Sequence, residues 1–166
     1  ARAIKDIPLD EVSRMTTGLG ELDRVLGGGL VAGQCVLLAG EPGVGKSTLL
    51  LEAADKYARG AKKPRTVLYI SGEESAEQIS IRAKRIGVNA ESLLIADETD
   101  LAVLLGHVED TDPDLLIVDS VQTIASAELD GRAGGVAQVH EVTQVLTRAA
   151  KGRRMLLLLI GQSTRD

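Results

Sequence analysis

Short apolar runs alternate with longer segments of mixed polarity along most of this chain, and this alternation constrains its fold more than any other feature. Apolar runs bounded by polar residues are typical of strands buried on both faces, and the mixed segments are typical of helices. Their alternation predicts an α/β fold with a mainly parallel sheet and helices on both faces. The predicted strands are residues 34–39, 66–71, 92–96, 115–119 and 155–161, and the predicted helices are residues 46–59, 74–86, 101–109 and 136–150.

Length and composition fit one domain of this class. At about 150 residues per domain, a chain of 166 residues is expected to form one domain. The single Cys35 excludes a disulfide scaffold and is expected to be a small core residue. Because no apolar run approaches the length of a membrane helix and residues 1–10 hold no signal-peptide core, we expect a cytoplasmic protein without a membrane partner.

Charge and aromatic content limit how the chain could bind nucleic acid. Lys and Arg number 19 against 24 Asp and Glu, a formal net charge of −5, so there is no overall basic field. Tyr57 and Tyr69 are the only aromatic residues, so base stacking on an aromatic platform is not expected.

The residues that follow the predicted strands are strongly polar, in contrast to the strands themselves. In a parallel α/β sheet, ligands bind beyond the carboxyl ends of the strands, so we expect the functional site at this edge. The polar segments are Gly40 onward, Gly72 to Glu74, Asp97 and Glu98, Asp119 and Ser120, and Gln162 and Ser163.

Residues 40–47 match a phosphate-binding loop, in which two glycines separated by four residues precede Lys and Ser or Thr. Glycines let the backbone N–H groups face a β-phosphate, and the helix that follows adds the positive end of its dipole. Lys46 would supply a cation for the β- and γ-phosphates, and the Ser47 hydroxyl a Mg²⁺ ligand. A glycine-rich turn without a ligand is the alternative, which the position between an apolar strand and a helix disfavours. The predicted nucleotide-binding residues are Gly40, Glu41, Pro42, Gly43, Val44, Gly45, Lys46, Ser47 and Thr48.

Asp119 follows four consecutive apolar residues, which place its strand in the middle of the sheet, so it is expected to emerge at the ligand edge. A carboxylate there can hold a Mg²⁺-bound water, as a Walker B aspartate does. The alternative is an ordinary cap of a turn or helix, since Asp and Ser both cap well. The phosphate loop favours the metal role.

Glu73, Glu74 and Gln162 are candidates for the hydrolytic step. Hydrolysis needs a carboxylate that activates the attacking water, and we predict Glu73 in this role. Glu74 is expected to cap the following helix, where the dipole favours an acid; the alternative is that both glutamates only occupy that first turn. Gln162 ends the last strand and is expected to contact the γ-phosphate or the water; the alternative is an exposed polar residue.

Several motifs resemble the RecA-like ATPases, and most closely the bacterial RadA (Sms) family of DNA-repair and recombination ATPases. The RecA-like entry is TGLGELD at residues 17–23 and LGGGL at residues 26–30, directly before the phosphate loop. The similarity to RadA rests on YISGEESAEQI at residues 69–79, Arg82-Ala83, DSVQTI at residues 119–124, and Val139 after a glycine-rich loop. It runs through essentially the whole chain.

The resemblance implies ATP or ADP and Mg²⁺ as cofactors, bound between the subunits of a ring that is hexameric in the intact protein. It implies single-stranded DNA gripped by loops in the channel, with a recombinase or a replicative helicase as a further partner. It also implies that the strand of Gln162 lies between the loop strand and the strand of Asp119. Glu73 would be the water-activating carboxylate. Arg82 would lie against the adenine, with a solvated helix charge as the alternative.

The chain departs from the RadA pattern at several places. It lacks the four-Cys zinc module, the Lys-Asn-Arg-Phe-Gly segment and the Lon-protease-like domain, so we interpret residues 1–166 as an excised RecA-like ATPase core. As such a core it is expected to bind ATP and to hydrolyse it weakly. Gln162 stands where RadA has His, as in RecA itself, and His140 stands where RadA has Arg.

The sequence therefore predicts the core of a DNA-repair motor that couples Mg-ATP hydrolysis to single-stranded DNA binding or branch migration. Two alternatives share the fold: a KaiC-like regulatory ATPase, and a nucleotide-controlled oligomerisation module that does not act on DNA. Residues 125–135 form the longest stretch without periodicity and would line the channel. Arg132 is the only basic residue in this stretch.

Overall fold

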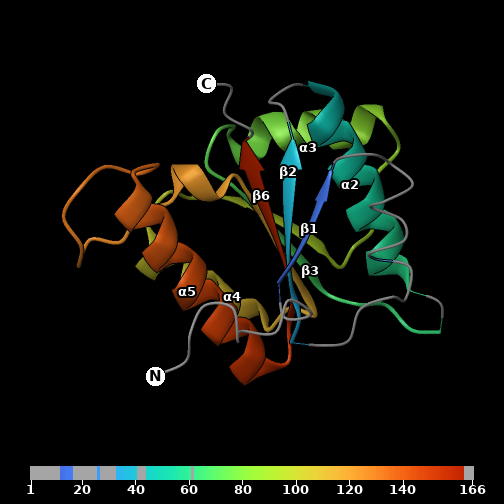
Figure 1. The fold of residues 1–166 in the computed structure, drawn as a ribbon. Helices are drawn as coiled ribbons and strands as arrows, with labels where there is room; N and C mark the ends of the chain where they lie inside the picture. Colours follow the sequence, from blue (N-terminus) through green and yellow to red (C-terminus); the bar gives the residue numbers. More distant parts are fainter. Residues whose placement is uncertain (1–11, 17–25, 27–32, 41–43, 61, 163–166) are drawn as a thin grey trace.

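The computed structural model describes residues 12–16, 26, 33–40, 44–60 and 62–162. Within this part of the chain, six strands form one sheet in the order β1-β2-β6-β5-β3-β4, and every neighbouring pair is parallel. Helices α2 and α3 cover one face of the sheet, and α4 and α5 cover the other (Figure 1). The predicted α/β class, with helices on both faces, is confirmed.

The strands and helices lie close to their predicted positions. The strands are β1 Val12–Thr16, β2 Cys35–Gly40, β3 Val67–Ser71, β4 Leu93–Asp97, β5 Leu115–Asp119 and β6 Leu156–Gln162. The helices are α2 Val44–Arg59, α3 Ala76–Arg85, α4 Leu101–Thr111, the short 3₁₀-helix η2 Val121–Thr123, and α5 Val136–Arg153.

β1 is the strand that the apolar runs did not predict. Its sequence, VSRMT, mixes polar and charged residues with apolar ones, and it lies at the edge of the sheet, beside β2. An edge strand needs no continuous apolar run, because it is not enclosed on all sides as a central strand is. Apolar runs therefore predicted the central strands and the other edge strand, β4, but not β1.

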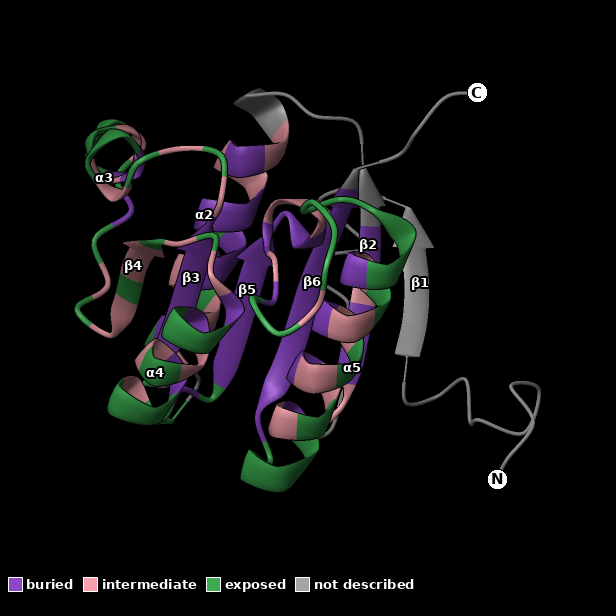
Figure 2. Cartoon of the chain, turned by 90° about the vertical axis from the view of Figure 1, so that its left-hand side faces the viewer, coloured by how far each residue is buried: buried purple, intermediate pink, exposed green. Residues whose placement is uncertain are grey.

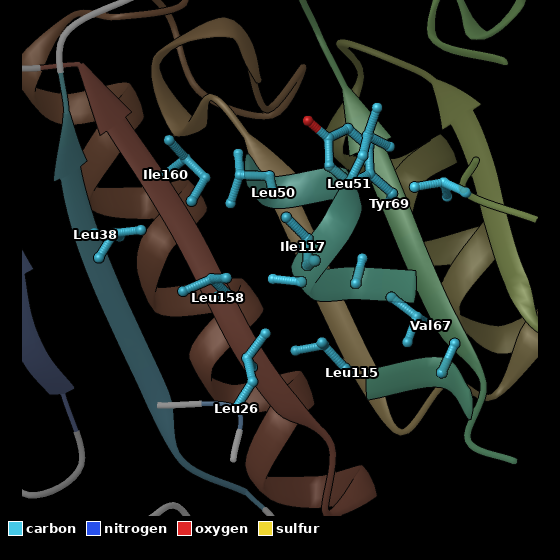
Figure 3. Packing of buried hydrophobic residues seen from close by; sticks show 14 of the residues in the cluster. Leu26, Leu38, Leu50, Leu51, Val67, Tyr69, Leu115, Ile117, Leu158 and Ile160 are labelled. Atoms are coloured by element: carbon cyan, nitrogen blue, oxygen red, sulfur yellow. The ribbon is translucent and has the colours of Figure 1, made fainter. Parts of the chain in front are cut away.

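The core consists of two apolar layers, one on each face of the sheet. On the first face, Leu50 and Leu51 of α2 pack over side chains of β5 and β6 such as Ile117 and Leu158 (Figure 3). On the second face, α4 and α5 contribute a second buried cluster. Every residue of β3 and β5 is buried, and the central strands form the buried middle of the molecule (Figure 2). Enclosure on both faces explains why these strands are almost wholly apolar.

Cys35 lies in this core, as the sequence predicted. It is 1% exposed at the start of β2 and forms no disulfide. Burial raises the pKa of its thiol to about 11. A thiol held protonated in apolar surroundings is unreactive, so its role is packing.

The strand order brings the polar strand ends to one edge. β6 lies between β2 and β5, as the resemblance to RecA-like ATPases implied. In the resulting register Gly40 pairs with Gln162, and Ser71 pairs with Asp119. Segments far apart in the sequence therefore meet at the carboxyl edge of the sheet.

No helix among the described residues is long and apolar enough to cross a bilayer.

Candidate nucleotide-binding site

The site is organised around the first turn of α2. This helix begins at Val44, within the predicted phosphate loop of residues 40–47, so Lys46 and Ser47 lie in its first turn. The first N–H groups of a helix have no partner within it and carry the positive end of its dipole, which favours a bound anion. Gly40, Val44, Gly45 and Thr48 lie in the flanking strand and helix, whereas Glu41, Pro42 and Gly43 lie outside the described residues.

A buried ion pair joins this turn to the end of β5. Lys46 Nζ lies 3.0 Å from Asp119 Oδ1, and the two side chains are 7% and 6% exposed. The residues are 73 positions apart in sequence. The structure thus brings together the predicted phosphate-binding lysine and the predicted Walker B aspartate.

The second oxygen of Asp119 faces Tyr69. The Tyr69 hydroxyl lies 3.4 Å from Asp119 Oδ2 and donates to it. Burial raises the pKa of Asp119 above its usual range; Lys46 opposes this shift, and the nearby Glu73 carboxylate adds to it. Burial, together with the Asp119 charge, also raises the pKa of Tyr69, so its hydroxyl remains a donor. The site therefore holds a carboxylate whose charge is costly without a cation.

Glu73 lies at the ends of β3 and β5. Ser120 Oγ donates to Glu73 Oε1 over 3.1 Å. The backbone N–H groups of Glu73 and Glu74 both donate to Ser71 Oγ, at 3.3 and 3.0 Å, and Ser71 is 3% exposed. A buried hydroxyl therefore fixes the turn that presents the two glutamates.

The prediction that Glu74 caps the next helix was wrong. Ser75 is the N-cap of α3 and forms a capping box with Gln78, so the helix begins at Ala76. This Ser-x-x-Gln spacing is a known helix-start signal and is present in the sequence. The Glu74 side chain instead accepts hydrogen bonds from Ser47 Oγ at 3.5 Å and from Arg82 Nη2 at 2.5 Å.

Arg82 is not a solvated helix charge. Its side chain is 17% exposed and forms an ion pair with Glu74, and this hydrogen bond raises the pKa of Arg82 above its usual range. Arg82 Nε is buried and has no hydrogen-bond partner among the described residues. The contact with adenine stays a prediction.

The sequence of this chain is similar to those of known proteins. Residues 5–164 match the model of the AAA domain family. The chain belongs to this AAA domain family. It is 52% identical over 154 residues to the DNA repair protein RadA of Mycolicibacterium smegmatis, covering 90% of this chain and 32% of that protein. It is 49% identical over 163 residues to RadA of Aquifex aeolicus, covering 98% of this chain and 36% of that protein.

The chain thus spans about a third of the length of these curated relatives. Among solved structures, a KaiC-like protein of Pyrococcus horikoshii OT3 superposes with a TM-score of 0.65 at 21% identity, covering 85% of this chain and 66% of that one. At this identity the likeness concerns the fold. The resemblance to bacterial RadA and the RecA-like fold, both predicted from the motifs, are confirmed.

The donor atoms of this AAA domain fit Mg²⁺. A serine hydroxyl and carboxylates are the hard oxygen ligands that Mg²⁺ prefers, and it is usually bound through one or two carboxylates together with substrate phosphates and water. Among the described residues, no group of three or more His, Cys, Asp or Glu side chains forms a ready-made metal cage.

The predicted site residue on β6 is placed through its backbone. Gln162 ends the strand beside Gly40, the first residue of the predicted phosphate loop. Its side chain lies outside the described part of the chain, so its contact with a γ-phosphate stays a prediction. His140, the other departure from the RadA pattern, is exposed on α5.

Gln138 is a site residue that the sequence argument missed. It is 1% exposed at the start of α5, and its amide binds the backbone of the loop before it. Its Oε1 accepts from Ser126 N at 2.8 Å, and its Nε2 donates to the carbonyls of Ser126, Leu129 and Gly131 at 3.1, 2.7 and 3.3 Å. The available signal was its four-residue spacing from Val142, Leu146 and Ala150, the buried stripe of α5.

Proposed function

We propose that this chain is the ATP-binding and ATP-hydrolysing core of a DNA-repair protein. The observation that carries the proposal is the buried Lys46–Asp119 pair beside Ser47 at the first turn of α2. Buried charges are expensive unless they are paired, and each of these two has a natural partner in a Mg²⁺–phosphate group. Binding of Mg-ATP would direct Lys46 to the phosphates and Asp119 to the water around the metal.

The hydrolytic step uses residues of the same edge. Bound Mg²⁺ would neutralise charge on the β- and γ-phosphates, with Ser47 as its protein ligand. Glu73 accepts the proton of the water that attacks the γ-phosphorus, while the bond to the β-phosphate oxygen breaks and ADP leaves. Ser120 orients Glu73 through its hydroxyl. Gln162 contacts the γ-phosphate, and Arg82 lies toward the adenine side.

The proposed substrate of the motor is single-stranded DNA, and the proposed assembly is a homo-hexameric ring. The DNA-repair name of relatives with about half of their aligned residues identical supports this assignment. The loop between η2 and α5 would face the DNA. A recombinase or a replicative helicase would be a further partner of the intact protein. Branch migration is the work that ATP turnover would drive.

The decisive experiment measures ATP turnover of the intact protein with and without single-stranded DNA. We expect DNA to raise the rate, and Lys46→Ala to abolish nucleotide binding or turnover. Turnover at the wild-type rate in Lys46→Ala would refute the phosphate-loop role. Turnover that DNA does not change, together with no DNA binding at low salt, would favour a KaiC-like regulatory ATPase.

A further inference from the structure

Glu74 lies beside the hydroxyl that is expected to bind Mg²⁺. Its Oε1 is 3.5 Å from Ser47 Oγ. Neighbouring ligands of an octahedral Mg²⁺, each about 2.1 Å from the ion, lie about 3 Å apart. Glu74 is therefore at the distance of a second ligand, or of a group that holds a metal-bound water.

Arg82 holds Glu74 in this place. The same Oε1 accepts from Arg82 Nη2 at 2.5 Å, and the two side chains are 17% and 33% exposed. Without this contact Glu74 would be a partly exposed carboxylate, free to turn toward water. The ion pair thus links α3 to the metal-binding side of the phosphate loop.

The two neighbouring glutamates have different partners. Glu73 accepts from Ser120, at the end of β5, whereas Glu74 accepts from Ser47 and Arg82. Asp119, the other carboxylate of the edge, is already compensated by Lys46. Glu74 is the carboxylate whose compensating cation comes from outside the phosphate loop.

We propose that Glu74 is a second acidic group of the Mg²⁺ site and that Arg82 is the positioning residue that keeps it aimed at Ser47. This inference rests on the proposed nucleotide function. It assigns the paired glutamates to separate tasks, with Glu73 acting on water and Glu74 on the metal. Groups that orient a metal ligand typically change metal affinity by 10–100-fold when they are replaced.

The test compares the affinity for a fluorescent ADP analogue in excess Mg²⁺ with that in excess EDTA. The ratio of the two dissociation constants measures how much the metal strengthens binding. We expect Glu74→Gln to reduce this ratio about 10-fold while the affinity in EDTA is unchanged. Arg82→Ala should reduce it to a similar extent, and Arg82→Lys, which retains the charge, should restore part of it.

Matched controls come from exposed residues of α3. Glu77→Gln and Arg85→Ala make the same chemical changes at exposed positions of α3 and should leave the ratio unchanged. If Arg82 acts through Glu74, Arg82→Ala has no additional effect on the ratio in a Glu74→Gln background. Circular dichroism establishes that each variant is folded.

The outcomes separate this proposal from the nucleotide function. A wild-type ratio in Glu74→Gln, or a further loss when Arg82→Ala is added to it, would overturn the metal role. A wild-type protein that binds the analogue equally in Mg²⁺ and EDTA would overturn it as well. A wild-type protein that binds no nucleotide under either condition would overturn the proposed function itself, and this inference with it.

Discussion

Two polar regions lie side by side at the carboxyl edge of the sheet, and different interactions stabilise them. At the phosphate edge, charged side chains pair with each other: Lys46 with Asp119, which is 73 positions away, and Arg82 with Glu74, which lies just before the same helix. In the loop of residues 124–135, one neutral amide, that of Gln138, binds backbone groups. Charged pairs can exchange their partners for a phosphate or a metal ion. The buried amide satisfies backbone groups of the loop, so it keeps the loop in one shape.

The two regions meet at η2. Ser120 contacts Glu73, and Thr123 Oγ1 donates to the Ser120 carbonyl at 2.6 Å. Gly72 approaches this turn so closely that an added Cβ would lie 1.9 Å from Thr123 Oγ1. Any side chain at Gly72 would push η2 away from Glu73. Contacts therefore run from Glu73 through η2 toward the loop that Gln138 holds.

The largest expected effect is that of a substitution at Glu73. Glu73→Gln should retain ATP binding and slow cleavage by about 10²–10⁴-fold, because the amide cannot accept the proton of the attacking water. Glu74→Gln should slow the chemical step less. Single-turnover hydrolysis measures both variants, and the reverse ranking would move the water-activating role to Glu74.

The buried Lys46–Asp119 pair predicts a loss of stability on removing one partner that removal of the other partner should recover. Lys46→Met leaves Asp119 buried without its cation and should lower the free energy of unfolding by about 3 kcal/mol. Adding Asp119→Asn removes the unpaired charge and should recover most of this loss. Urea unfolding without nucleotide measures the cycle.

Nucleotide binding provides the control for this cycle, since the double variant should remain unable to bind ATP. If adding Asp119→Asn recovers no stability, the buried pair is not the source of the loss. The charged pair would then not distinguish the phosphate edge from the loop that Gln138 holds.

For the loop that Gln138 holds, we expect a smaller loss of stability, with no second substitution that recovers it. Gln138→Leu keeps the side-chain size but removes the acceptor of the buried Ser126 N–H and the donor to the Leu129 carbonyl, which should cost about 2 kcal/mol. The loop should become open to proteolysis while ADP affinity is unchanged. Gln144→Leu, on an exposed position of the same helix, is the matched control. An equal loss in both variants would show that the amide does not hold the loop.

The smallest expected effect is a pH dependence at Asp119. Its folded-state pKa is raised above the unfolded value of about 3.9, mainly by burial, so the folded state retains the proton to higher pH. The stability that this proton contributes is complete below about pH 3.9 and is lost as pH rises through the folded pKa. One proton changes stability by at most about 1.4 kcal/mol per pH unit.

Asp119→Asn removes this dependence. The free energy of unfolding of the wild type, minus that of the variant, should therefore fall as pH rises above about 4. Urea unfolding at several pH values without nucleotide measures the difference. A difference that rises over this range would mean that Lys46 outweighs burial at this carboxyl.

Prediction from sequence succeeded where the signal is local. The apolar run before Asp119 located β5 with its correct ends, because a strand enclosed on both faces must be apolar throughout. It failed for β1, whose edge position imposes no such run. It also misplaced the Glu74 side chain, although the Ser75–Gln78 box that replaces it at the helix start was present in the sequence.

The sequence by itself determined the α/β class and the chemistry of the nucleotide edge, since glycine spacing, Lys46 and Ser47 act within a few residues of one another. The pairing of Lys46 with Asp119 and the contact of Glu74 with Ser47 were decided by tertiary structure. So was the burial of Gln138, which depends on which face of α5 meets the sheet. The physical reason is that periodicity reports on neighbours along the chain, whereas these contacts join elements whose packing and register are set only when the whole sheet forms.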